Sequence, residues 1–562
     1  MKALFLVAVM SFAIIGTASA ANFQDVSSDI VTSTTWTSDT CYQLTQQIYV
    51  TDGATLTIEA GTVVASTAGL GGSLAVCRDG YIRIMGEEGN PVIMTSTNDV
   101  ATWDVDPIHP SGGDPTTGNW RTGVNEWGNL TLMGEGYISA SHYEYVPVEY
   151  QDGVLSATHT NTKVPDGLNK KVMEGLVADP WGDPRVIYGG NDDDDDSGEI
   201  HYLSLRYGGK VIALQNELNG LSLGAIGRAT DIDHVEIMNN VDDGIEIWGG
   251  TVQLKYVSIW NIGDDSFDVD EGWRGKAQHG LIVQGYSADA KQGSGVGDNC
   301  FETDGAEDSD AQPVTTSTIY NFTVVGQPAD GDFGTCWRDN ARIQYRNCIF
   351  MDLGDQLVGY DGYDTDGAMG YDGEEGKSRN TCVDGTLTWE ETWTTDAGTH
   401  STINTGGLTP AQLDVMYPIQ SSGKLAEIVD SVFFRNLKSS GAYVESTSLG
   451  VHLGATNNVT SVYNAGSPDD NMPIVTLTRA TTPFISSSQS KVIYPVEFIN
   501  PMAANDAIDS ASNGITGDSF FDTADYRGGF SASTNWLMGW TAAAAYGMTG
   551  TGTSDVRNWE MY

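Results

Sequence analysis

Two acidic segments of this chain match each other at a spacing of 22 positions. Residues 242–248 (DDGIEIW) align with residues 264–270 (DDSFDVD), and a β-type run precedes each segment, at 234–237 and 256–259. If equivalent residues lie side by side in the fold, their carboxylates form a row of like charges. These charges repel one another unless a cation, a shared proton or an arginine lies between them. The pattern therefore indicates either cation binding or acid–base chemistry by paired carboxyl groups.

Every candidate metal ligand in this row is a carboxylate, and a third acidic stretch near residue 300 extends the row. Calcium is the metal that fits best, because it binds about six to eight oxygen ligands and accepts flexible geometry. A solvated row of acidic turns without an ion is the alternative. The predicted Ca²⁺ ligands are Asp242, Asp243, Glu246, Asp264, Asp265, Asp268, Asp270, Asp298, Glu302 and Asp304.

The elements that must position these side chains are short strands. A repeat with two strand-like pieces and a glycine-marked turn is typical of one coil of a parallel β-helix. Successive coils stack about 4.8 Å apart, so that like residues of neighbouring coils become neighbours in space. Residues 48–63, 81–94 and 199–351 have the same strand-and-turn character. We therefore predict an all-β fold, a parallel β-helix (solenoid) with inserted loops and terminal caps.

The expected units follow from where this periodicity begins, lapses and ends. The chain opens with a charged start, a short apolar segment and the small-residue site Ala18-Ser19-Ala20, which is typical of a secretory signal peptide. No later apolar run is long enough for a transmembrane helix. The expected units are a signal peptide (1–20), an N-terminal lead-in or cap (21–45), a β-helix (46–525) with loop insertions near 98–190 and 352–425, and an aromatic C-terminal cap (526–562).

The charge balance is strongly acidic, with 75 acidic and 27 basic residues and a net charge of −48. Phosphate binding requires clustered lysine and arginine, so nucleic acid is excluded as a partner and an anionic lipid surface is disfavoured. The clustered acids favour divalent cations. The remaining charge is expected to keep an exported protein soluble.

Six cysteines, an even number in a chain expected to be exported, predict disulfides. If residues 300–304 stack on residues 336–340, Cys300 lies over Cys336 within disulfide reach, and Arg338 lies over Glu302. The pairs Cys41–Cys77 and Cys348–Cys382 then follow by elimination. No Cys-x-x-Cys motif is present, so neither Cys-ligated zinc nor c-type haem is expected.

Three motifs carry a resemblance to a known group of proteins. Residues 53–63 (GATLTIEAGTV) resemble the opening coil of many secreted bacterial right-handed β-helix proteins, and residues 217–223 (ELNGLSL) resemble the central coils of a largely uncharacterised exported group of that kind. Residues 526–530 (YRGGF), with Trp536 and Trp540, are similar to the C-terminal motif of that group. The resemblance implies the right-handed, pectate-lyase-like fold and export. It implies no activity, because one fold hosts many functions.

A catalytic use of the carboxylate row is the alternative to a binding role. Glycoside hydrolases of the polygalacturonase type share this fold and have an acid, Gly-Asp-Asp, His-Gly and Arg-x-Lys in that order. Their chemistry needs one carboxylic acid to protonate the leaving oxygen and one carboxylate to activate water. In a lyase, Arg274 or Lys276 would serve as the base beside Ca²⁺; the alternative is that these two residues only neutralise the acidic turn. The predicted catalytic residues are Asp243, Asp264, Asp265 and Arg274, and the residues that complete the hydrolase order are His279-Gly280 and Arg342-Ile343-Gln344, with glutamine in place of the lysine.

Two further acidic stretches and two tryptophans have open interpretations. The aspartate run 192–196 is either a solvated loop tip or a surface Ca²⁺ loop. Residues 361–373 resemble a calcium loop but not an EF-hand, because glycine stands at two ligand positions. Trp248 and Trp273 flank the row, and they either pack in the core or stack on sugar rings.

These observations lead to two function classes. We predict a secreted, acidic, Ca²⁺-stabilised β-helix protein that acts extracellularly or at the outer cell surface, with the periplasm as a further possible address. It would be a binding or structural module with a polysaccharide or a cell-surface component as its partner. The alternative is a polysaccharide-degrading enzyme, a glycoside hydrolase or lyase, that uses the carboxylate row. An open groove lined by the acids would favour the enzyme.

Overall fold

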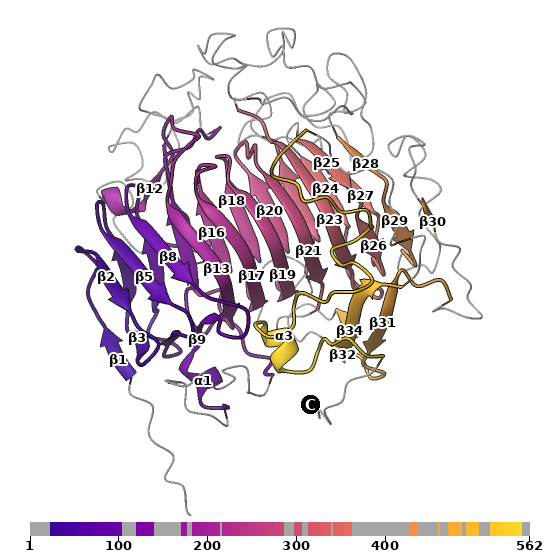
Figure 1. Cartoon of the computed structure of the whole chain (residues 1–562), viewed down its shortest axis with the longest axis horizontal. Coiled ribbons are helices and arrows are strands. Elements are labelled where there is room, and N and C mark those ends of the chain that lie inside the picture. The colour runs from indigo at the N-terminus through magenta and orange to yellow at the C-terminus, as the bar shows by residue number, and fades with distance from the viewer. Residues whose placement is uncertain are drawn as a thin grey trace, which may run out of the picture.

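Two long parallel β-sheets wind along one axis and form a solenoid of stacked coils (Figure 1). Each central coil contributes a short strand to one sheet and a longer, bent strand to the other. In the part of the chain that the structure describes, no helix is long and apolar enough to span a membrane. This computed structural model describes residues 23–103, 120–139, 170–176, 183–213, 216–285, 297–305, 313–338, 341–361, 417, 426–436, 459–460, 470–485, 491–504, 508 and 517–553.

The smaller of the two sheets, called sheet B here, has nine strands that pair in parallel. In their order across the sheet they are β4 (Gln47–Val50), β7 (Ser73–Val76), β10 (Leu130–Met133), β16 (Leu221–Gly224), β18 (Ile245–Trp248), β20 (Phe267–Asp270), β22 (Phe301–Asp304), β24 (Thr335–Arg338) and β27 (Val358–Asp361).

The larger sheet, called sheet A, has 17 strands, again paired in parallel. They are β1 (Phe23–Val26), β2 (Thr34–Trp36), β3 (Cys41–Leu44), β5 (Thr55–Glu59), β6 (Val63–Ser66), β8 (Tyr81–Met85), β9 (Val92–Ser96), β13 (Gly198–Arg206), β17 (Asp231–Asn240), β19 (Gln253–Ile262), β21 (Lys276–Val283), β23 (Thr316–Val325), β25 (Arg342–Arg346), β26 (Ile349–Met351), β28 (Glu427–Val429), β29 (Val432–Phe434) and β30 (Val459–Thr460).

Short elements decorate this solenoid. Four antiparallel pairs are formed by β11 (Lys171–Val172) with β12 (Ile187–Tyr188), β14 (Val211–Ala213) with β15 (Asn216–Glu217), β31 (Ile474–Arg479) with β34 (Val496–Ala503), and β32 (Phe484–Ile485) with β33 (Val492–Ile493). The helices are α1 (Thr97–Val100), the 3₁₀ helix Pro184–Val186 and α3 (Ala542–Ala545).

The predicted 22-residue register is confirmed on both sheets. On sheet B, Glu246 pairs with Asp268 and Trp248 with Asp270. On sheet A, residues 235–238 of β17 pair with residues 257–260 of β19. The inward positions of these strands are apolar and wholly buried in one continuous core, which explains why the alternating pattern was readable in the sequence.

The long strands of sheet A bend in the middle, and each bend is one residue in the left-handed region. Tyr202, His234, Tyr256 and His279 occupy this position with φ between 48° and 62°. This conformation is uncommon for residues other than glycine. Here the bend residues stack on one another, with ring centroids 4.1, 4.3 and 4.8 Å apart along the column. This packing compensates for the free-energy cost of the left-handed backbone conformation.

The solenoid differs from the expected boundaries at its start and in the first insertion. Within the described residues it begins at Phe23, because β1 and β2 already pair with β3 and β5, so residues 23–45 contribute strands to the first coils. The expected insertion near 98–190 contains Leu130–Met133, which is a full strand of sheet B between β7 and β16. One coil of the solenoid therefore lies within this segment, although the sequence on either side of Leu130–Met133 lacks the repeating strand pattern.

The C-terminal segment lies along the side of the solenoid, across the outer face of sheet A (Figure 1). We call residues 517–553 the C-terminal strap. Its Trp536 and Trp540 pack edge-on against the His234 ring in the bend column. Salt bridges from Lys255 to Asp522, at 2.8 Å, and from Lys276 to Asp518 fix its other end. The aromatic residues that suggested an end cap therefore cover a lateral face.

The described cysteines form no disulfide. Sheet B places Cys336 opposite Glu302, so Cys300 and Cys336 are two residues out of the predicted register. A shift of two residues keeps the same side chains inward, so the alternating pattern could not reveal it. Cys41 lies in β3 of sheet A whereas Cys77 follows β7 of sheet B, so this predicted pair is also wrong. Cys382 lies outside the described residues.

Candidate metal centre

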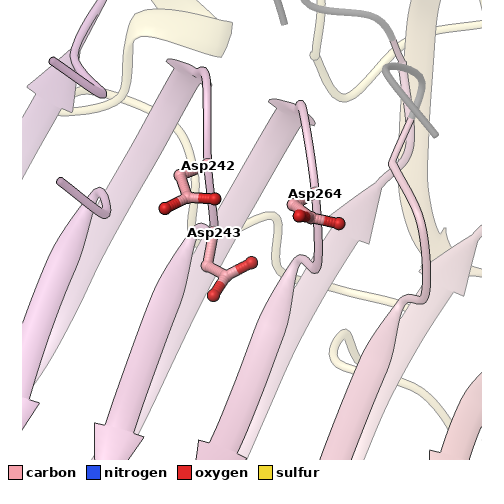
Figure 2. Close-up of side chains that lie close together, drawn as sticks. All are labelled: Asp242, Asp243 and Asp264. Atoms are coloured by element: carbon pink, nitrogen blue, oxygen red, sulfur yellow. The ribbon is translucent and has the colours of Figure 1, made fainter. Parts of the chain in front are cut away.

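The acidic row lies along the turns that lead from sheet A into sheet B. Asp242 and Asp243 lie in the turn between β17 and β18, and Asp264 lies in the next turn, between β19 and β20 (Figure 2). A third turn, before β22, carries Asp298. Since β18, β20 and β22 pair in parallel, the three turns stack on one another. The structure therefore brings together the carboxylates that the repeat predicted.

The inner column of these turns is a chain of hydrogen bonds between coils. The Asn219 side chain accepts from the Asp243 amide at 3.3 Å, Asp243 accepts from the Asp265 amide at 2.8 Å, and Asp265 accepts from the Asn299 amide at 2.5 Å. Asp243 and Asp265 are buried, where an amide without an acceptor is costly. Both aspartates, predicted as ligands and as catalytic groups, thus join one coil to the next with one carboxylate oxygen.

A further acidic row lies on the outer surface of sheet B, just past the turns. Glu246, Asp268 and Glu302 occupy equivalent positions on β18, β20 and β22. Asp304 lies two residues further along and contacts Arg338 at 3.3 Å. The Arg338 guanidinium also contacts Glu302, although the strand register sets Arg338 opposite Asp304 and not over Glu302 as predicted.

Two groups of three carboxylates lie close enough to share an ion. One group is Asp242, Asp243 and Asp264, and the other is Asp243, Glu246 and Asp268. In each group, one oxygen per residue lies within 4.8 Å of the others. Calcium–oxygen bonds of about 2.4 Å place opposite ligands about 4.8 Å apart, so both groups fit Ca²⁺. The donor set is entirely oxygen, which suits Ca²⁺ better than zinc.

Burial and mutual repulsion raise the pKa values across this cluster. Burial, and then the nearby Glu302, raises the pKa of Asp264 to about 7. Burial, and then Asp332, raises the pKa of Asp298 to about 8. Burial is again the first cause, and neighbouring carboxylates the second, of pKa values well above the ordinary range for Asp242, Asp243, Glu246, Asp265 and Asp268. The cluster therefore favours either bound protons or a bound cation.

Three members of this site were not predicted. Glu217 and Glu174 both add to the negative potential at Asp242. Asn219 heads the hydrogen-bonded column, and its Asn219-Gly220 pair repeats the Asp243-Gly244 pair, so the repeat could have revealed it. Glu174 comes from a segment that is tied to the solenoid through the β11–β12 pair, and nothing in its own sequence indicates that contact.

Arg274 has a structural role rather than the catalytic one predicted for a lyase. Its side chain is wholly buried, and its guanidinium donates to the Asp193 carboxylate at 2.5 and 2.7 Å and to the Tyr137 carbonyl at 3.2 Å. A guanidinium has donors and no acceptor, and the donors of Arg274 are directed at Asp193 and Tyr137 and not at a substrate position beside the carboxylate row. Asp193 belongs to the run 192–196, where Arg228 also contacts Asp194 at 2.9 Å, so arginines anchor this loop to the solenoid.

The residues of the hydrolase order do not assemble into one site. His279 lies at the bend of β21, stacked on Tyr256 and 3.3 Å from the Tyr526 hydroxyl, whereas Asp264 lies in the turn before β20. Arg342 is wholly buried at the start of β25. These groups thus lie at different corners of the coils, although they follow the hydrolase order along the chain.

The two tryptophans beside the row pack in the protein interior. Trp273 is wholly buried in the main core, and its indole N–H donates to the Val252 carbonyl at 3.0 Å. Trp248 is buried against Tyr188. Neither presents a ring for a sugar, so core packing, one of the two interpretations, is confirmed. The acidic stretch 361–373 lies outside the described residues from position 362 onward.

The chain matches the pectate-lyase-like β-helix domain over residues 28–164 and 182–409. It therefore belongs to the family of pectate-lyase-like β-helix proteins. This membership supports a role connected with polysaccharides in general terms. No curated protein and no solved structure matches the chain.

Proposed function

We propose that the carboxylate row binds Ca²⁺ between successive coils, and that the chain is an exported β-helix module which this ion stabilises. It acts outside the cell or at the outer cell surface, where it binds polysaccharide. The observation that carries the proposal is the presence of two sets of three carboxylates, each set close enough to share one ion, with Asp243 common to both sets. Membership of the pectate-lyase-like family supports the polysaccharide as partner.

The charges around the site support a cation. Arg338 contacts Glu302 and Asp304 at one end of the row, and Lys171 contacts the buried Glu271 nearby. Within the described residues, Asp242, Asp243 and Asp264 form no ion pair. Ca²⁺ would replace the protons that these buried carboxyl groups otherwise hold. Because its ligands come from two coils, it would bind the folded chain and not the unfolded one, and so stabilise the fold.

Thermal unfolding of the mature protein at fixed ionic strength tests the metal site. With Ca²⁺ at about 100 times its dissociation constant, the folded state gains about 2.7 kcal/mol, which raises the melting temperature by a few degrees. Mg²⁺ should act more weakly, because it demands near-octahedral geometry at shorter distances. Asp264→Asn should remove most of the Ca²⁺ effect. Asp25→Asn, a change of an exposed aspartate on β1, should leave it intact.

An equal Ca²⁺ effect in the Asp264→Asn and Asp25→Asn variants would contradict the site. Absence of any Ca²⁺ effect in the wild-type protein would contradict the metal altogether.

One observation favours an enzyme as the second candidate. The pKa values of Asp264 and Asp298, at about 7 and about 8, would let one carboxyl group act as a general acid near neutral pH. If the protein cleaves a glycan, Asp264→Asn should abolish cleavage while the unfolding of the metal-free protein stays close to that of the wild type. Glycan binding without the release of reducing ends or unsaturated products would identify a binding module.

A further inference from the structure

We propose that the outer face of sheet A holds a second binding site, which takes an uncharged pyranose chain. A cavity of about 310 Å³ opens on this face, a volume at the lower end of the range for small-molecule sites. None of its lining residues belongs to the carboxylate row, so the proposal does not depend on the Ca²⁺ site. The lining consists of Thr55, Tyr81, Arg83, Asp196, Gly198, Glu199, Ala229 and Asp231.

The alternation of the strands builds this surface. In β8, Ile82 and Ile84 point into the core and are wholly buried, so Tyr81 and Arg83 point outward. Parallel pairing then sets Arg83 opposite Glu199, and Glu199 opposite Asp231. Polar groups therefore repeat once per coil, about every 4.8 Å along the solenoid axis. This repeat is close to the length of one pyranose unit in an extended chain.

Tyr81 supplies the apolar surface of the site. It is 38% exposed, and the other exposed large hydrophobic residues in the described part of the chain, Val31, Leu70 and Ile485, are aliphatic. An exposed aromatic ring beside hydrogen-bonding side chains is suited to the flat, C–H-bearing face of a sugar. Gly198 has φ +115°, and a Cβ at this position would lie 1.9 Å from the Ile82 carbonyl oxygen. Glycine therefore allows β13 to lie this close to β8.

The charges of the lining select against an acidic sugar. Arg83 is paired with Glu199 at 2.5 Å, which leaves the carboxylates of Asp196 and Asp231 without a lining cation. A uronate would be repelled by these two groups. Hydroxyl groups, in contrast, can donate to carboxylates and accept from the guanidinium. An uncharged, hydroxyl-rich chain is the ligand that matches this set.

The C-terminal strap bounds the open surface on one side. Asp522 of the strap contacts Lys255 on β19 at 2.8 Å, and Phe521 packs edge-on against Tyr320 on β23. The strap therefore covers the first part of β19, at Lys255, and it crosses β17 further along that strand, at the bend residue His234. The cavity lies on β5, β8, β13 and β17, where Tyr81 and Arg83 remain exposed. A glycan running along the axis would meet these four strands in succession.

Isothermal titration of the full mature protein with hexasaccharides tests the site. The probes are neutral gluco-, manno- and xylo-oligosaccharides, with oligogalacturonate as the acidic comparison, and a chelator is present throughout. We expect at least one neutral oligosaccharide to bind. Tyr81→Ala should weaken that binding by at least about tenfold, and Tyr81→Phe should retain most of it. Leu70→Ala, a change at an exposed residue outside the cavity, should have no effect.

Each other outcome overturns the proposal. Failure of every neutral oligosaccharide to bind would do so, as would binding that Tyr81→Ala leaves unchanged. Binding of oligogalacturonate alone, and only after Ca²⁺ is restored, would support the carboxylate row as the glycan site and reject the cavity. Circular dichroism confirms that the variants fold, which is expected because Tyr81 lies on the surface.

Discussion

At the residue scale, the aspartates of the inner column stabilise the fold through hydrogen bonds, whether or not they also bind a ligand. Asp243 accepts the Asp265 amide, and Asp265 accepts the Asn299 amide, so each carboxylate closes a turn of the following coil. Asn219 performs the same task without a charge. An asparagine is therefore sufficient for the hydrogen bond. The extra charge at Asp243 and Asp265 raises the electrostatic cost of the metal-free state, which is consistent with a role in binding a cation.

This division of tasks predicts opposite effects for two substitutions of Asp243 in the metal-free protein. Asp243→Ala should destabilise the fold by about 1–3 kcal/mol, because the buried Asp265 amide loses its acceptor. Asp243→Asn keeps an acceptor oxygen and removes one charge from a crowded cluster, so its stability should match or exceed that of the wild type. Urea unfolding without Ca²⁺ measures both. Equal losses in the two variants would show that the hydrogen bond is not the important contact.

At the scale of elements, the bend column of sheet A decides where the strap can dock. His279 is 2% exposed, stacks on Tyr256 and lies 3.5 Å from Asp522 of the strap. Asn321 continues the column on β23 with φ 57°, which shows that asparagine is compatible with the bend. The column thus combines aromatic packing with two histidines, His234 and His279, beneath the strap.

Burial of His279 predicts a loss of stability in acid. Burial lowers its pKa from 6.5 to about 4. The unfolded chain therefore takes up a proton below pH 6.5 that the folded chain excludes, and the free energy of unfolding should fall as the pH falls from about 6.5 to about 4. His279→Asn removes this titration and should flatten the dependence. Denaturant unfolding at pH 7 and pH 4.5 compares the two slopes, and identical slopes would contradict the assignment.

At the scale of the whole molecule, the strap connects coils that are distant in sequence. The amides of Ala542 and Ala543, at the start of α3, donate to the wholly buried Glu236 of β17 at 2.6 and 3.0 Å. The Ser204 hydroxyl donates to the same carboxylate at 2.6 Å. Apolar strap residues, including Leu537, cover an outer apolar cluster of sheet A. Solenoids must shield such surfaces, and here the shield runs along the side.

Glu236 should therefore control the attachment of the strap. Glu236→Ala removes the acceptor for two helix amides and one of the two carboxylates beside the buried Arg206, the other being Asp99, at a cost of about 3–5 kcal/mol. We expect limited proteolysis to cut within the strap of this variant before it cuts the solenoid. Glu59→Ala, a change of an exposed glutamate on β5, is the matched control and should resist as the wild type does. A strap that stays protected in Glu236→Ala would refute this role.

The amino-acid sequence alone specifies the period of the solenoid and the neighbours within it. Alternation and turn residues are local features, and the 22-residue spacing is enough to place Glu246 beside Asp268. The same spacing brings the turn aspartates into one row. These predictions succeed because each coil contacts mainly the next coil, so a local pattern repeats as a contact in space.

Which side chains are available for function depends on the tertiary structure. Arg274 is bound by Asp193 from a distant loop, and His279 is covered by the strap. The candidate catalytic residues therefore do not form one site, although they follow the expected order along the sequence. The register of Cys300 and Cys336 differs by two residues, a shift that alternation cannot detect. The cavity beside Tyr81 stays open because the strap crosses β17 at its bend, at His234, and not at its beginning, where Asp231 lines the cavity. All of these depend on contacts between segments far apart in the chain, which no local pattern records.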